Sequence, residues 1–147
     1  MREAYVIRPW RDSDRKALEK SVNEYGLNIV DPCSPVVPDD NCRHHSVVAQ
    51  FGGKVVGYAA VIEIGGDAGL HVFVMPDHRA AGLRPLGMQL VDGALQAARA
   101  AGIKRVTARM SWKNAAALLE AKKLGFVPLG GRTTGVNRGY YDFEKEL

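Results

Sequence analysis

Three β-type runs separated by glycine turns constrain the fold of this chain more than any other feature. "SVVAQFGGKVVGYAAVIEIGG" holds two runs rich in β-branched residues, joined by Phe51-Gly52-Gly53-Lys54, whose glycines supply the positive φ of a tight turn. A third run, "GLHVFVMP", follows Gly65-Gly66-Asp67 and ends at Pro76. Consecutive strands joined by short turns pair as neighbours. The sequence therefore predicts an antiparallel meander of three strands.

The segment after this meander has a helical period. From Pro85 to about Ala101 the apolar residues recur every three or four positions, with Pro85 suited to the first helical position and Gly102 to the stop. We expect this stripe to lie against the sheet. It consists of Leu86, Leu90, Val91, Ala94, Leu95 and Ala98.

The remaining segments complete an alternating pattern. "AYVIRPW" predicts a first strand and "DSDRKALEKSVNEYG" a helix that Asp12, Ser13 or Asp14 caps. The stretch from Leu27 to His45 is predicted to be a long irregular connection. "KRVTARM" predicts a strand, "NAAALLEAKKLG" a helix, and "FVPLG" and "GYYDFEKEL" two final strands. The order β α β β β α β α β β predicts one α/β domain over residues 1–147 with a mixed sheet.

Composition excludes several classes of protein. With 46% hydrophobic and 24% charged residues, the chain is an ordinary globular domain, and no run reaches the roughly 18 to 20 apolar residues of a membrane span. The N-terminus is charged too early for a signal peptide, and Cys33 and Cys42 fit free thiols in a reducing compartment. A cytoplasmic location is expected. No metal is predicted, because these cysteines with His44 and His45 match no standard zinc spacing.

The net charge of +4 is spread along the chain. A nucleic-acid-binding protein more often gathers its basic residues on one face with interleaved aromatics, so nucleic acid is not the expected partner. A basic pocket for a small anionic ligand fits the same charge.

The loop "MPDHRAAGLRP" places small residues and two arginines between a strand end and a helix start. Backbone N–H groups in such a loop, the helix dipole, and the side chains of Arg79 and Arg84 form the chemistry of a pyrophosphate cradle. A solvated turn with two surface arginines is the competing interpretation, and the loop alone does not decide between them.

The setting of this loop resembles a known family. "VMPDHRAAGL" is similar to the acyl-CoA motif of the GNAT superfamily of acyl-CoA-dependent N-acyltransferases, and "NAAALLEAKKLGF" has the spacing of its second signature. The opening "IRPWRDSDRKAL" is similar to the family's first strand and helix, so the resemblance covers almost the whole chain. It implies a mixed, mostly antiparallel sheet flanked by helices and splayed between the fourth and fifth strands.

The resemblance also implies roles for individual residues. The backbone of Val72 and Val74 would pair with the pantetheine arm of acetyl-CoA, as an added strand would. Asn114 would contact the pantetheine or order the neighbouring strand end. The residues implied to hold the pyrophosphate are Arg79, Ala80, Ala81, Gly82, Leu83 and Arg84.

The chain departs from the family pattern in three places. Arg84 and Pro85 stand where the family has a second small residue, and Gly87 is an alternative match to the motif's last glycine. Ala121 stands where many relatives carry a tyrosine that protonates the leaving thiolate, and Tyr140 or Tyr141 is the candidate substitute. Ala68 stands near the position of the glutamate base of some relatives, which leaves Glu63, Asp67 and His71 as candidate bases.

The predicted function is N-acetyl transfer from acetyl-CoA, as co-substrate, to a primary amine of a small molecule or peptide, by direct attack in a ternary complex. The alternative is a weakly active or inactive CoA-binding or protein-interaction module on the same fold, which the absent tyrosine and glutamate favour. No membrane partner is predicted, and a homodimer is left open. The connection from Leu27 to His45 and the tail from Gly130 to Gly139 are expected to line the acceptor.

Overall fold

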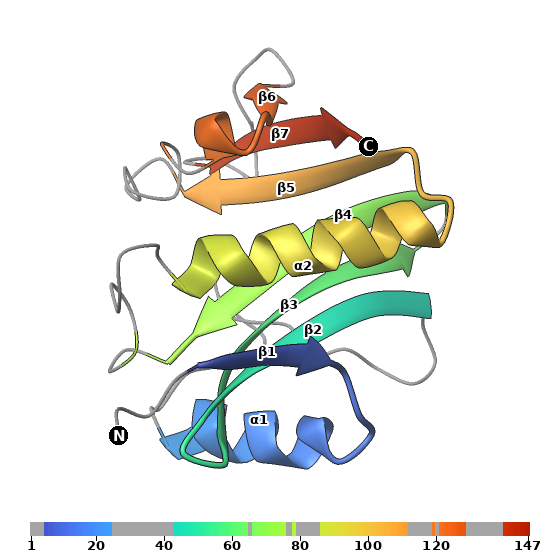
Figure 1. The fold of residues 1–147 in the computed structure, drawn as a ribbon. Helices are drawn as coiled ribbons and strands as arrows, with labels where there is room; N and C mark the ends of the chain where they lie inside the picture. Colours follow the sequence, from blue (N-terminus) through green and yellow to red (C-terminus); the bar gives the residue numbers. More distant parts are fainter. Residues whose placement is uncertain are drawn as a thin grey trace.

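A seven-stranded sheet with helices against its faces forms the body of the protein in a computed structural model (Figure 1). The structure describes residues 5–24, 43–64, 66–75, 78, 86–111, 119, 121–128 and 140–147. Strand order is β1-β2-β3-β4-β5-β7-β6, and all neighbours are antiparallel except β4 and β5, which are parallel. The predicted mixed and mostly antiparallel α/β fold is therefore confirmed.

The order of the elements is the predicted one. Residues 119 and 121–123 are helical and lie within the third predicted helix, "NAAALLEAKKLG". The bounds are β1 Val6–Pro9, α1 Asp14–Glu24, β2 Arg43–Phe51, β3 Lys54–Ile64, β4 Asp67–Val74, α2 Leu86–Ala100, β5 Arg105–Ser111, β6 Val127–Pro128 and β7 Tyr140–Glu146.

The predicted hairpin joins β2 to β3. Gly52 and Gly53 form the turn with φ of 57° and 78°, as the glycine pair indicated. The predicted connection, however, ends too late: β2 begins at Arg43, so His44 and His45 lie in a strand. They do so because β3 is long enough to pair with them, His44 opposite Ile62 and His45 opposite Val61.

Helix α2 buries its apolar stripe against the sheet. All six predicted stripe residues are buried, which confirms the helical period as the signal. The helix ends in a Schellman motif: the N–H of Ile103 donates to Ala98 O at 3.1 Å, the N–H of Gly102 donates to Arg99 O at 3.0 Å, and Gly102 has a φ of 89°. The predicted stop at Gly102 is thus confirmed.

Gly57 of β3 lies close both to the neighbouring strand β4 and to helix α2. A Cβ atom at this position would lie 2.8 Å from the backbone oxygen of Phe73 and 3.2 Å from Cδ1 of Leu90. Since side chains alternate between faces along a strand, Gly57 faces α2 and the adjacent Tyr58 faces the other side, where α1 packs against β3 (Figure 1).

We expect Gly57→Ala to destabilise the protein by about 1 to 3 kcal/mol, because the added methyl group must push β3, β4 or α2 apart. Urea unfolding measures this loss. Gly87→Ala, in the first turn of α2, is the matched control, since its Cβ meets only Cγ2 of Val74 at 3.9 Å. The control is expected to be neutral or slightly stabilising. Equal stability of the two variants would contradict the close approach at Gly57.

Candidate active site

The sheet opens between its two parallel strands. The β4–β5 ladder consists of Gly69 opposite Thr107 and Leu70 opposite Ala108, and beyond these pairs the two strands diverge (Figure 1). On the side of the ladder where β4 begins, the hydroxyl of Thr107 donates to the carbonyl oxygen of Ala68 at 3.3 Å. The strands are therefore held together at the start of β4 and apart at its end, which is the predicted splay.

The backbone of β4 presents polar groups to this opening. The N–H of Met75 donates to Val56 O at 2.8 Å, so Met75 hydrogen-bonds toward β3. Because backbone groups alternate sides along a strand, those of Val74 and Val72 point away from β3, to the side where the β5 ladder has ended. Val72 is 46% exposed. An extended ligand with amide groups fits this edge.

Most of the predicted pyrophosphate loop lies outside the described residues. This holds for Arg79, Ala80, Ala81, Gly82, Leu83 and Arg84, and for Asn114 in the second signature. The residue just ahead of the loop is described: the N–H of His78 donates to Met75 O at 2.9 Å, which turns the chain at the end of β4.

His71 is placed on β4 beside the opening. It follows Leu70, the last residue of β4 in the parallel ladder, and faces the side of the sheet opposite α2, together with Gly69 and Phe73. Burial lowers the pKa of the imidazole below its ordinary value of 6.5, because the charged form loses hydration. The ring is therefore neutral at pH 7, which is the form that accepts a proton.

Glu63 contacts two basic side chains at the end of the sheet where β3 ends and β4 begins, away from the opening. Its Oε2 atom lies 3.0 Å from Nε2 of His45 and 3.1 Å from Nε of Arg43. The Arg43 side chain is 68% exposed, whereas that of His45 is 13% exposed. These contacts compete with any role of Glu63 in taking a proton from a substrate.

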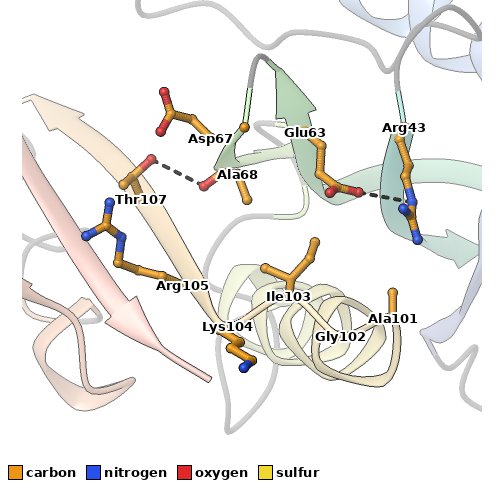
Figure 2. A pocket seen from close by; sticks show the side chains of 11 residues that line it. Arg43, Glu63, Asp67, Ala68, Ala101, Gly102, Ile103, Lys104, Arg105 and Thr107 are labelled. Atoms are coloured by element: carbon orange, nitrogen blue, oxygen red, sulfur yellow. Dashed lines mark hydrogen bonds and ion pairs between the residues drawn. The ribbon is translucent and has the colours of Figure 1, made fainter.

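A cavity of about 400 Å³ lies at this same end of the sheet, between the starts of β4 and β5 and the end of α2 (Figure 2). Glu63 and Asp67 line it, as do Thr107 and Ile103, and Arg43 and Arg105 stand at its sides. His71 is not part of its lining.

The predicted candidate bases therefore do not form one cluster. From Asp67 to His71 the strand advances about 13 Å, at about 3.3 Å per residue, and the closed β4–β5 ladder lies between them. Glu63 pairs with Ala68 and lies at the Asp67 end. A general base must come within hydrogen-bond reach of the proton it takes. Of the three candidates, His71 is the one that lies next to the opening.

The candidates for the leaving-group acid lie on other strands. The backbone of Tyr140 begins β7 and pairs with Ser111, at the end of β5 that has diverged from β4. Ala121, the position at which the resemblance implied a tyrosine, is 2% exposed, and its carbonyl oxygen accepts a hydrogen bond from the N–H of Phe126 at 2.9 Å. With Gly125 at a φ of 88°, this forms the turn of the "LGF" signature.

The histidine pair of β2 is divided between the two faces of the sheet. The His44 ring contacts Trp10 at 5.7 Å between centroids, and its Nδ1 lies 2.8 Å from Ser46 Oγ, whereas His45 contacts Glu63. Cys33 and Cys42 lie outside the described residues. Among the helices that the structure describes, none is long and apolar enough to cross a membrane.

One contact near the site has no sequence signal. Tyr5 Oη lies 2.8 Å from Nδ1 of His78, and the two residues are 73 positions apart. The motif contains His78, but sequence reasoning assigned a role to neither residue, since nothing in a single sequence pairs residues that far apart.

Comparisons with known proteins match this geometry. The model of the acetyltransferase (GNAT) family matches residues 7–126. YncA of Salmonella typhimurium, solved with its cofactor acetyl-CoA, has a TM-score of 0.73 at 22% identity, over 98% of this chain and 94% of that one. A GNAT-family acetyltransferase of Streptococcus pneumoniae has a TM-score of 0.75 at 20% identity, over 98% and 99%.

A third structure, ribosomal-protein-alanine N-acetyltransferase of Brucella melitensis, has a TM-score of 0.71 at 22% identity, over 97% of this chain and 99% of that one. No curated protein matches the sequence significantly. Because the family model spans most of the chain and the sheet opens where such a fold requires, this chain belongs to the acetyltransferase (GNAT) family, whose acetyl donor is acetyl-CoA.

Proposed function

We propose that this protein transfers the acetyl group of acetyl-CoA to a primary amine, by direct attack in a ternary complex. The observation that carries the proposal is the opening of the sheet beyond Leu70 and Ala108, with the backbone polar groups of Val72 and Val74 directed into it. A pantetheine arm carries two amides, and these pair with such an edge as a further strand would.

In this proposal the loop after His78 binds the pyrophosphate of the co-substrate. Backbone N–H groups of residues 79–83 hold the pyrophosphate at the start of α2, where the helix dipole favours negative charge. Arg79 adds charge-assisted hydrogen bonds, Arg84 lies at the end of the loop, and Asn114 contacts the pantetheine.

The chemical step needs a base because an amine is protonated at neutral pH. In this proposal the neutral His71 takes a proton from the ammonium group, and the nitrogen lone pair then attacks the thioester carbonyl carbon. A C–N bond forms and the C–S bond breaks, the bonded nitrogen releases its second proton to water to give the neutral amide, and the leaving sulfur takes a proton from Tyr140 or from water. A thiol pKa of about 8.5 makes the thiolate a tolerable leaving group, so this acid contributes less than the base.

Holding both substrates side by side contributes several kcal/mol without any covalent enzyme intermediate. The acceptor is an amine of a small molecule or peptide. The Brucella neighbour is named for acetylation of a ribosomal-protein alanine, and that chemistry supports an amine acceptor here. The reaction is assigned to the cytoplasm, where the cysteines of this chain stay reduced.

The test is a turnover screen over amines that follows release of free CoA thiol, with acetyl-CoA binding measured by thermal shift. Arg79→Ala is expected to raise the KM for acetyl-CoA roughly 10- to 100-fold, which corresponds to the roughly 1.5 to 3 kcal/mol of its charge-assisted hydrogen bonds. Arg99→Ala is the matched control, because this exposed arginine lies in the last turn of α2 whereas the loop precedes the first turn, and the KM of this variant for acetyl-CoA is expected to be unchanged.

Two other results of this screen would indicate a different function. Binding of acetyl-CoA without thiol release on any amine would indicate a CoA-binding module. Absence of acetyl-CoA binding together with retention on DNA that weakens steeply with salt would indicate a nucleic-acid-binding domain and overturn the proposal.

A further inference from the structure

Three aromatic rings meet at the end of the sheet where β1 begins and β4 ends. Val6 pairs with Gln50, so Tyr5 and Phe51 continue the β1–β2 register, and their ring centroids are 4.8 Å apart. The ring of His78 lies 5.7 Å from that of Tyr5 and 5.2 Å from that of Phe51. Figure 1 shows the start of β1, the β2–β3 turn and the end of β4 at this common end.

His78 is fixed at two points. Its Nδ1 atom lies 2.8 Å from the hydroxyl of Tyr5, and its backbone N–H donates to Met75 O at 2.9 Å. Its ring stands nearly perpendicular to that of Tyr5, at 89°, so edge and face meet as aromatic rings prefer. Ring and backbone together leave this residue little freedom of orientation.

The position of His78 in the chain gives this contact its meaning. The next residue is Arg79, and consecutive Cα atoms are about 3.8 Å apart, so the direction in which the chain leaves His78 sets where the following amides begin. A cradle of backbone N–H groups binds phosphate well when the groups converge before the ligand arrives.

We propose that Tyr5 and His78 are positioning residues for acetyl-CoA: the hydrogen bond between the Tyr5 hydroxyl and Nδ1 of His78, whose ring also contacts Phe51, fixes the point from which the chain enters the predicted pyrophosphate loop. This inference rests on the proposed function. Its consequence is that a residue outside the binding motif, supplied by the N-terminal segment, determines affinity for the co-substrate but takes no part in the chemical step.

Tyr5→Phe tests the hydroxyl alone, because the phenylalanine ring retains the contact with Phe51. We expect the Kd for acetyl-CoA, measured by calorimetry, and the KM for acetyl-CoA to rise about two- to tenfold, while kcat at saturating acetyl-CoA and the KM for the amine stay unchanged. A merely structural role predicts the opposite pattern: a lower melting temperature of the ligand-free protein with unchanged affinity.

Two substitutions at His78 form a matched pair. The side-chain amide of asparagine occupies the place of Nδ1, whereas that of glutamine reaches the place of Nε2. His78→Asn is therefore expected to keep most of the affinity for acetyl-CoA, and His78→Gln to lose as much as Tyr5→Phe. In the double variant Tyr5→Phe/His78→Gln the loss is expected to be no larger than in either single variant, because both remove one bond.

Failure of this inference is distinguishable from failure of the proposed function. If the wild-type protein binds acetyl-CoA and both Tyr5→Phe and His78→Gln bind it equally well, the positioning role is wrong and the proposed function stands. If these losses appear in kcat instead of the acetyl-CoA Kd, the positioning role is also wrong. Absence of acetyl-CoA binding by the wild type would overturn both.

Discussion

Replacement of His71 by glutamine is expected to lower kcat/KM for amine acetylation by about 10²- to 10⁴-fold, the usual contribution of a positioned general base. The ring lies on β4 beside the point where β5 departs, and burial keeps it neutral at pH 7 by lowering its pKa. Glutamine preserves much of the shape but cannot take the proton. Steady-state kinetics at saturating acetyl-CoA measure the loss.

The pH dependence gives a second test of His71. Because its pKa is lowered from 6.5 by desolvation, the acid limb of the wild-type kcat/KM profile is expected below pH 6.5, and it should disappear in His71→Gln. Protein stability should follow the same group. The folded state resists protonating the buried ring, so the stability of the wild type falls as the pH drops below 6.5, and less so in the variant.

His45→Gln is the matched control for this prediction. His45 lies on β2 in contact with Glu63, away from the opening. Its substitution is therefore expected to leave kcat/KM nearly unchanged. Glu63→Gln and Asp67→Asn test the other two candidate bases, which line the cavity beyond the closed ladder. A large loss of kcat/KM in Glu63→Gln or Asp67→Asn, with His71→Gln still active, would identify that carboxylate as the general base and contradict the assignment to His71.

The second large effect concerns folding. Asp14→Ala is expected to destabilise the protein by about 3 kcal/mol, because it leaves the largely buried charge of Arg8 without its carboxylate partner. Arg8 donates to both carboxylate oxygens of Asp14, at 2.9 and 2.7 Å, and the N–H of Arg11 donates to the same carboxylate at 2.7 Å. The two side chains are 11% and 3% exposed. Urea unfolding measures the loss.

The pH dependence of this pair has a definite sign. Burial alone would raise the pKa of Asp14, but the hydrogen bonds from Arg8 and Arg11 outweigh it and lower the pKa. A lowered carboxyl pKa stabilises the fold above the unfolded value of about 3.9, and this stabilisation is lost as the pH falls through the folded value. The stability difference between wild type and Asp14→Asn should therefore shrink below about pH 4.

Arg43→Ala is the control for the ion pair. Arg43 also pairs with a carboxylate, that of Glu63, but its side chain is 68% exposed, so its loss is expected to cost less than about 1 kcal/mol. A cost for Asp14→Ala as small as that of Arg43→Ala would show that the Arg8–Asp14 pair contributes little.

Local signals predicted most of the fold. The buried stripe of α2, its stop at Gly102 and the turn at Gly52 and Gly53 each depend on neighbouring residues, whose period or backbone conformation is written in the sequence. Strand bounds near His44 failed because the partner strand, which decides them, lies elsewhere in the chain.

The candidate site was predicted less completely. The motif located the strand, the loop and the helix start, and the opening beyond Leu70 confirmed the splay. Periodicity did not separate Glu63 and Asp67 from His71, because that separation depends on where the β4–β5 ladder closes. The contact between Tyr5 and His78 likewise arises from the tertiary fold.

The short β4–β5 ladder also divides the molecule mechanically. Among the described residues, two register pairs and the hydrogen bond from Thr107 to Ala68 join β4 to β5, whereas β3 and β4 share eight register pairs and β5 and β7 share seven. We expect this seam between β4 and β5 to be a boundary between cooperative unfolding units, at which partial opening begins. A ligand lying along it would tie both units together, and each catalytic cycle would then stiffen and loosen the whole sheet.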